Sequence, residues 1–89
     1  MKIELKSVVI EGGSMMEKRL GQILSDMYKE APEGDKVTFI HLFGIKYADS
    51  IKNNNLSIKK ILEYSSVKPS FVTEVNKGVK LARYVGVKK

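Results

Sequence analysis

Two short helical segments joined by a tight connection lie between Ser57 and Lys77, and they constrain the fold more than any other feature. Ser57 is a suitable N-cap for the first segment, because its hydroxyl can accept a hydrogen bond from an amide of the first turn. Pro69 suits the first turn of the second segment, where its missing N–H would have no partner in any case. The contact between two such helices is small, so their apolar residues have to face each other and the preceding helix.

Residues 57–76 resemble, in register and without gaps, the helix-turn-helix of lac-repressor-type regulators. The residues that carry the resemblance are Ile61, Glu63, Tyr64, Val67, Val72 and Val75. The match covers less than a quarter of the chain. It implies membership of the broad helix-turn-helix class and not identity as a repressor.

Two positions depart from the pattern of that class. Leu62 stands where a small alanine usually permits close helix approach. Ser66 stands where glycine usually adopts a positive φ, which serine adopts less readily. The departures predict either a looser helix crossing or a turn of different geometry.

The resemblance implies that the second helix enters the major groove of DNA while the first contacts the backbone. The groove-facing residues would then be Pro69, Ser70, Thr73 and Glu74. The two hydroxyls can donate to or accept from base edges, and Glu74 can accept from cytosine N4. A glutamate near phosphates weakens binding, and the central positions hold no Arg, Gln or Asn. Contacts to the DNA backbone are therefore expected to predominate.

The charge distribution agrees with a polyanionic partner for the second half of the chain. Residues 1–45 carry six Lys/Arg and seven Asp/Glu, whereas residues 46–89 carry ten Lys/Arg and three Asp/Glu. Such asymmetry favours contact with nucleic acid, although a solvated lysine-rich surface is the simpler alternative. The cations expected to contact phosphates are Lys59, Lys60, Lys68, Lys77, Lys80 and Arg83.

Two longer helices are expected before this motif. Residues 15–30 have apolar positions at helical spacing, and Ser14 with Glu17 forms a capping box in front of them. Residues 36–53 form the most apolar helix, which Asp35 can cap. The asparagine run that follows ends this helix, because asparagine tolerates the left-handed conformation.

A small β element is expected in addition. Residues 2–10 alternate between apolar and polar side chains and predict a strand, and 79–87 alternate loosely and could pair with them. Gly78 would end the preceding helix, although a helix continued through Tyr84 is the alternative. The fold class is therefore mostly α with a small β element (α+β). It is a four-helix domain with a helix-turn-helix at 57–77.

The length suits a single domain, residues 1–89. Residues 1–13 form either an N-terminal strand or a segment added in cloning before a native start at Met15 or Met16. A core this small gives marginal stability, so pairing in a homodimer remains possible. The methionine-rich stripe of the first helix could belong to an interaction face, although packing within the chain is the default.

Several kinds of site are not expected. The chain has no cysteine, which excludes disulfides, thiolate metal sites and cysteine nucleophiles and suits a reducing cytoplasm. His41 is the only histidine and lies in an apolar helix, so a structural role is expected rather than a metal site. No cofactor or small-molecule ligand is indicated, and the apolar runs are too short to span a membrane.

The sequence thus favours a basic helix-turn-helix protein that binds duplex DNA in a regulatory system such as transcription regulation, or in a restriction or mobile-element system. The alternative is a protein–protein interaction module on the same scaffold, which Glu74 and the substituted turn favour. A small enzyme ranks well below both, because no nucleophile is paired with a base. RNA ranks below DNA, because no glycine-rich clamp or aromatic RNA-reading pattern is present.

Overall fold

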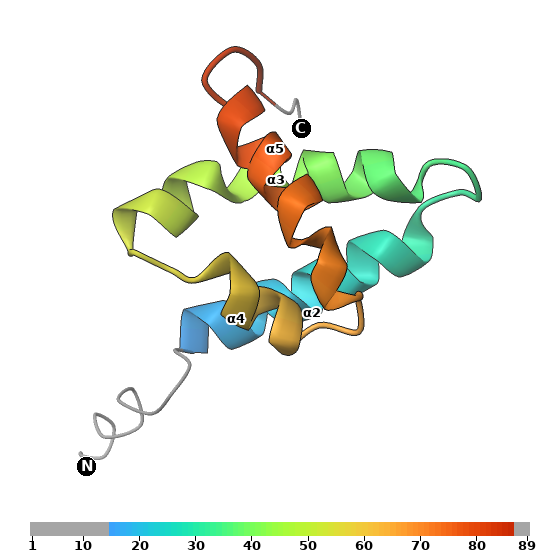
Figure 1. Ribbon diagram of the computed structural model, residues 1–89, viewed down its shortest axis with the longest axis horizontal. Coiled ribbons are helices and arrows are strands. Elements are labelled where there is room, and N and C mark those ends of the chain that lie inside the picture. The colour runs from blue at the N-terminus through green and yellow to red at the C-terminus, as the bar shows by residue number, and fades with distance from the viewer. Residues whose placement is uncertain (1–14, 87–89) are drawn as a thin grey trace.

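A computed structural model describes residues 15–86, which form four α-helices and one short 3₁₀ helix (Figure 1). The elements are α2 (Met15–Glu30), α3 (Lys36–Asn53), α4 (Ile58–Glu63), η2 (Pro69–Phe71) and α5 (Val72–Leu81). Helices α2 and α3 are joined by a short loop, α4 packs on α2, and α5 crosses α3. Between residues 15 and 86, no helix has the length and apolar character needed to cross a membrane.

The predicted β element is wrong. No strand occurs in residues 15–86, so the described fold is all α rather than α+β. The expected strand at 79–87 is replaced by the last turn of α5 and a following turn, where the Tyr84 N–H donates to the Leu81 carbonyl at 2.8 Å. The other expected strand, residues 2–10, lies outside the described residues.

Helical spacing explains why the tail is not a strand. Val75, Gly78 and Val79 recur at positions three and four apart and are buried together. Leu81, which alternation would place on the same side as Val79, is 43% exposed. Burial of the helical stripe therefore outweighs the loose alternation, and the continued helix is the better interpretation of this segment.

The sequence signals at the helix ends are confirmed in part. Ser57 caps α4, its hydroxyl accepting from the Lys60 amide at 3.2 Å. Asp35 occupies the N-cap position of α3 but makes no side-chain capping bond. After α3, Asn55 adopts a φ of 52°, the left-handed conformation expected of the asparagine run. The predicted capping partner Ser14 lies outside the described residues.

Glu17 has a role that local sequence did not predict. Its side chain is buried, and its Oε2 accepts a hydrogen bond from the Ser57 N–H at 2.6 Å. A carboxylate at the N-terminus of a helix also interacts favourably with the helix dipole. Glu17 thus ties the start of α4 to α2 across forty residues of sequence.

Helices α3 and α5 cross in backbone contact at Gly44 and Gly78. A Cβ on Gly78 would lie 2.9 Å from the Gly44 Cα and would overlap the His41 carbonyl oxygen. A Cβ on Gly44 would lie 2.5 Å from the Val75 carbonyl oxygen. Gly78 is therefore not the helix stop that its position suggested, but the residue that lets α5 lie directly on α3.

The core fills the space between the α2–α3 pair and the two later helices. Its largest fully buried side chains come from all four α-helices: Leu24, Ile40, Phe43, Ile61, Leu62 and Val75. Val67 in the turn after α4 belongs to the same cluster. The helix-turn-helix segment is thus an integral part of the core, as its apolar spacing predicted.

We expect Gly78→Ala to destabilise the protein. The overlap with α3 should cost about 1–3 kcal/mol net, even after the roughly 1 kcal/mol that alanine gains over glycine inside a helix. Denaturant unfolding followed by circular dichroism measures the free energy of unfolding. Gly86→Ala is the control, because a Cβ at Gly86 meets nothing within 4 Å. Equal stabilities of the two variants would contradict the backbone contact.

Candidate nucleic-acid interface

The turn between α4 and η2 is anchored to α2 by serine hydroxyls. The Ser66 N–H donates to Ser25 Oγ at 2.7 Å, and the Val67 N–H donates to Ser65 Oγ at 3.0 Å. Ser65 Oγ in turn donates to the Leu62 carbonyl at 2.8 Å. The start of the second helix is therefore fixed relative to α2, which orients α5.

The structure explains both departures from the usual helix-turn-helix pattern. Ser66 does not adopt a positive φ, so the turn differs in geometry from one that uses glycine. Leu62 is fully buried, and the close helix approach on α4 is made with α2. A Cβ on Gly21 of α2 would lie only 2.7 Å from both the Ile61 carbonyl oxygen and the Tyr64 Cβ.

The solvent-facing side of η2 and α5 carries polar and basic residues. Thr73, Lys77 and Lys80 are exposed and recur at positions three and four apart, so they lie on one face of α5. Pro69 and Ser70 are exposed at the start of η2, before this face. Three of the predicted DNA-contacting residues thus lie along one exposed face of α5, and Pro69 and Ser70 precede them.

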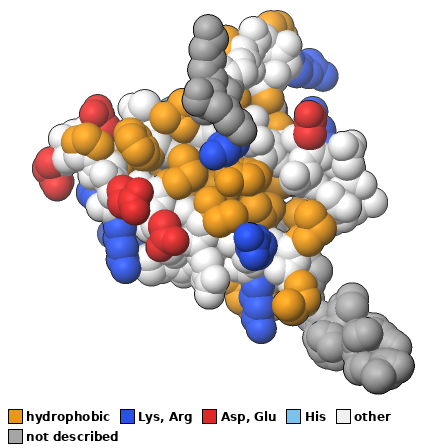
Figure 2. Space-filling model, turned by 180° about the vertical axis from the view of Figure 1, so that it is seen from behind, with side chains coloured by type: hydrophobic (Ala, Val, Ile, Leu, Met, Phe, Trp, Pro, Cys, Tyr) orange, Lys and Arg blue, Asp and Glu red, His pale blue; other side chains and the backbone are white. Residues whose placement is uncertain are grey.

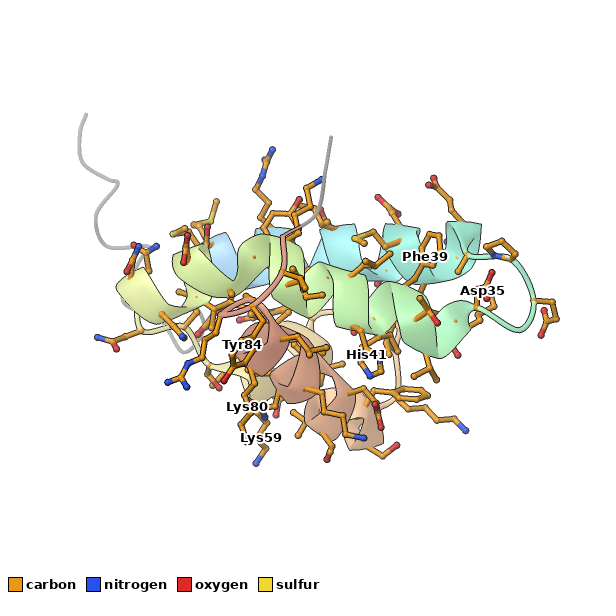
Figure 3. All side chains as sticks on the ribbon, turned by 90° about the horizontal axis from the view of Figure 1, so that it is seen from above. Asp35, Phe39, His41, Lys59, Lys80 and Tyr84 are labelled. Atoms are coloured by element: carbon orange, nitrogen blue, oxygen red, sulfur yellow. The ribbon has the colours of Figure 1, made fainter. Side chains whose placement is uncertain are left out.

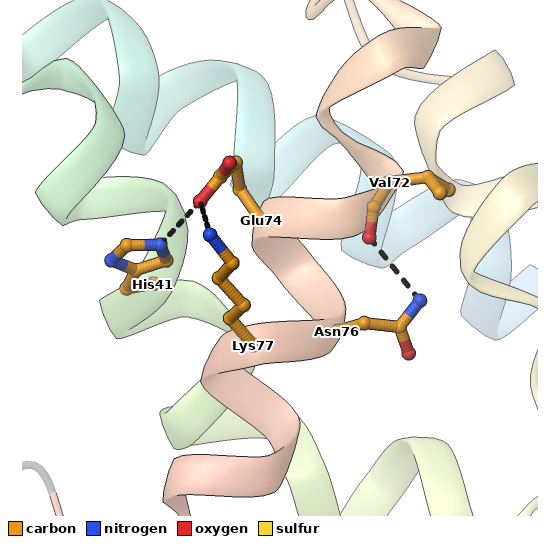
Figure 4. A network of polar contacts seen from close by, with 5 residues as sticks. All are labelled: His41, Val72, Glu74, Asn76 and Lys77. Carbon is orange, nitrogen blue, oxygen red and sulfur yellow. Dashed lines mark hydrogen bonds and ion pairs between the residues drawn. The ribbon is translucent and has the colours of Figure 1, made fainter.

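Glu74, also predicted to face a base, is turned toward α3 (Figure 4). Its Oε1 lies 2.6 Å from His41 Nε2 and 3.6 Å from Lys77 Nζ. The hydrogen bond from His41 is the largest influence on the pKa of Glu74 and lowers it. Burial acts in the opposite direction, and the charge of Lys77 lowers the pKa further. His41 is thus structural, joining α3 to α5.

The predicted phosphate-contacting cations fall into two groups. Lys77 and Lys80 line one hollow with Leu81 and Tyr84, and Lys80 lines a second with Arg83. The other group comprises residues of α4 and the following turn: Lys59, Lys60 and Lys68. In Figure 3, Lys59, Lys80 and Tyr84 lie toward one end of the molecule, and acidic Asp35 lies at the other.

Three residues near this surface were not predicted. Asn76 is exposed on α5, and its Nδ2 donates to the Val72 carbonyl at 3.3 Å. Lys52 at the end of α3 lines the hollow that contains Lys80 and Arg83. Tyr84 is 78% exposed after α5. The alternative of a helix continued through Tyr84 was the sequence signal that could have placed Tyr84 beside α5. No such signal existed for Lys52, because only the crossing of α3 and α5 brings it to this surface.

Comparison with protein families identifies the domain. Residues 16–88 match the model of a family described as HTH-like domain, which covers the four helices and the turn. The chain belongs to the HTH-like domain family. Comparison with curated proteins and with solved structures finds no match. Within residues 15–86, no group of three or more His, Asp or Glu residues is placed to hold a metal ion.

The His41–Glu74 pair makes stability depend on pH. Because the folded pKa of Glu74 is lowered from 4.5, its contribution is present above pH 4.5 and is lost as the pH falls through the lowered value. We expect Glu74→Gln to remove this part of the acid-induced loss of stability. Free energies of unfolding measured in steps below neutral pH test it, with Glu33→Gln in the distant loop as control. If Glu74→Gln keeps the full acid-induced loss, the pair contributes nothing.

Proposed function

We propose that this HTH-like domain binds duplex DNA through the exposed face of α5, mainly by contacts to the phosphate backbone. The observation that carries the proposal is the row of Thr73, Lys77 and Lys80 on one exposed face of that helix. Lysine side chains at such spacing can neutralise successive phosphates and release their counterions. Membership of the HTH-like domain family supports the same function.

The side chains available for reading bases are few. Ser70 and Thr73 offer hydroxyls at the first turns of the second helix, and Pro69 offers apolar contact. The hydrogen bond with His41 holds Glu74 Oε1 toward α3, which leaves the other carboxylate oxygen, Oε2, as its acceptor for a base. Asn76 adds an amide at the edge of the same face. Such a set supports modest sequence specificity, with affinity supplied by cations.

The distribution of charge favours one orientation on DNA. Lys59, Lys60 and Lys68 extend the basic surface from α5 to α4 and the turn. The acidic side chains of the α2–α3 corner are Asp26, Glu30, Glu33 and Asp35, and Figure 3 places Asp35 at the opposite end from Lys80. These four carboxylates therefore lie away from the phosphates in this orientation, whereas Glu63 of α4 and Glu74 of α5 remain on the side of the basic surface. We further propose that the protein works in the cytoplasm, as part of a regulatory, restriction or mobile-element system.

We expect the double variant Lys77→Gln/Lys80→Gln to weaken binding to every duplex alike. Each lost phosphate contact should reduce the slope of log affinity against log salt by about 0.9. Fluorescence anisotropy with a random duplex at several salt concentrations measures affinity and slope. Lys29→Gln is the matched control, because Lys29 is an exposed lysine in the last turn of α2 and is not among the predicted DNA-contacting residues.

Several outcomes of this titration would contradict the proposal. Absence of binding to any duplex at low salt would reject it, as would equal losses in the double variant and in Lys29→Gln. Tighter binding to double-stranded RNA or to single strands than to duplex DNA would assign a different nucleic-acid partner. No binding to any nucleic acid would instead favour the protein-interaction alternative.

We expect Thr73→Val to reduce discrimination among duplex sequences, because valine keeps the shape of threonine and removes its hydroxyl. One lost hydrogen bond to a base should cost about 1 kcal/mol for the preferred sequences and little for the others. Affinities across a panel of duplexes test this. Thr38→Val on the exposed side of α3 is the control. Unchanged discrimination in Thr73→Val would remove Thr73 from the set of base-reading residues.

A further inference from the structure

An apolar patch covers the face of the molecule opposite α5, formed by the outer sides of α2 and α3 (Figure 2). Helical spacing assigns to it Met16, Ile23 and Met27 of α2, which recur at intervals of seven and four residues. From α3 it includes Phe39 and Leu42, both partly exposed, and Figure 3 shows Phe39 on the side away from α5. Phe39 and Leu42 belong neither to the described core cluster nor to the side chains packed against it.

The charges on this side of α2 have opposite signs at its two ends. Arg19 lies near the N-terminus of α2 and Asp26 near the C-terminus, and both are exposed. Their spacing of seven residues places them on the same side of the helix, about 10.5 Å apart along its axis at ~1.5 Å per residue. They are too far apart to pair with each other.

We propose that this face joins two copies of the chain in a two-fold symmetric dimer, with the two α2 helices antiparallel and the axis near Ile23. In this arrangement Arg19 of each copy lies beside Asp26 of the other, so the Arg19–Asp26 ion pair forms twice, once on each side of the axis. The apolar residues then pack across the axis, which is how an isologous interface uses one self-complementary patch.

A second copy fits this surface better than a membrane does. A helix that lies on an anionic bilayer carries mainly basic residues on its polar face, whereas α2 presents Asp26 and Glu30 beside its apolar stripe. Opposite charges at the two ends of one helix are complementary to the same helix in reverse. Methionine side chains also adapt well to a contact between identical surfaces.

The geometry of such a dimer has a consequence for DNA, which rests on the proposed function. The two-fold axis of an isologous dimer lies within the interface, so surfaces opposite the interface point in opposite directions. The two α5 helices would therefore face outward on opposite sides. The dimer would bridge two duplex segments and would not read two half-sites on one side of a single duplex.

Charge exchange tests the interface without DNA. We expect Arg19→Glu and Asp26→Arg each to raise the dimer dissociation constant about tenfold. The double variant, which restores opposite charges across the axis, should recover the wild-type constant. Sedimentation equilibrium of the full chain measures it, with thermal unfolding by circular dichroism to confirm that each variant is folded. Lys59→Glu, on the opposite side of the molecule from the patch, should leave the constant unchanged.

Several results of these measurements would overturn the proposed dimer. A wild-type chain that remains monomeric up to about 1 mM would overturn the proposal, and so would a dimer whose constant does not respond to Arg19→Glu, Asp26→Arg or their combination. Replacing Leu42 with lysine provides an independent check, because it should abolish the dimer through the apolar patch alone. An unaffected dimer in that variant would also reject the interface.

Bridging is tested by capture of a fluorescent duplex on an immobilised duplex. Wild-type protein should retain the fluorescent duplex, whereas Leu42→Lys should bind single duplexes normally and retain none. Dimerisation without any duplex binding would reject the proposed function and keep the interface. Duplex binding by a chain that remains monomeric would reject the interface and keep the proposed function.

Discussion

The backbone contact between Gly44 and Gly78 is the constraint on which the arrangement of α5 depends. It lets α5 lie directly across α3, since a Cβ on either glycine would meet backbone atoms of the other helix. Because α5 is held this closely, Val75 and Val79 on either side of the crossing are buried. The opposite side of the same helix, with Thr73 and Lys80, is thereby turned to solvent.

The same crossing determines what Glu74 does. Where α5 lies against α3, Glu74 meets His41 and accepts a hydrogen bond at 2.6 Å, with Lys77 nearby. A carboxylate that would repel phosphates is thus partly neutralised within the fold. One of the two sequence arguments for a protein-interaction scaffold was the presence of Glu74 on the second helix, and its hydrogen bond with His41 weakens that argument.

Sequence alone predicted the helices, the Ser57 cap and the burial of Val67, because these follow from local spacing and capping chemistry. Sequence alone failed where contacts between helices determine the role of a residue. Glycine near a helix end usually marks a stop, and only the position of α3 reveals that Gly78 is a packing residue. The hydrogen bond from the Ser57 N–H to Glu17 likewise joins segments that are far apart in the sequence, which local spacing could not predict.

The proposed dimer interface would compensate for the low DNA affinity expected of the proposed α5 surface. In the proposed function, a single α5 face with few base-reading side chains would bind DNA weakly at physiological salt, because its affinity would rest mainly on screened phosphate contacts. Joining two such faces makes the second binding event intramolecular, which raises affinity without any new contact. Because the two faces would point apart in the proposed dimer, this gain would be realised only where two duplex segments are close together. A protein of this design would respond to the proximity of DNA segments more than to their sequence.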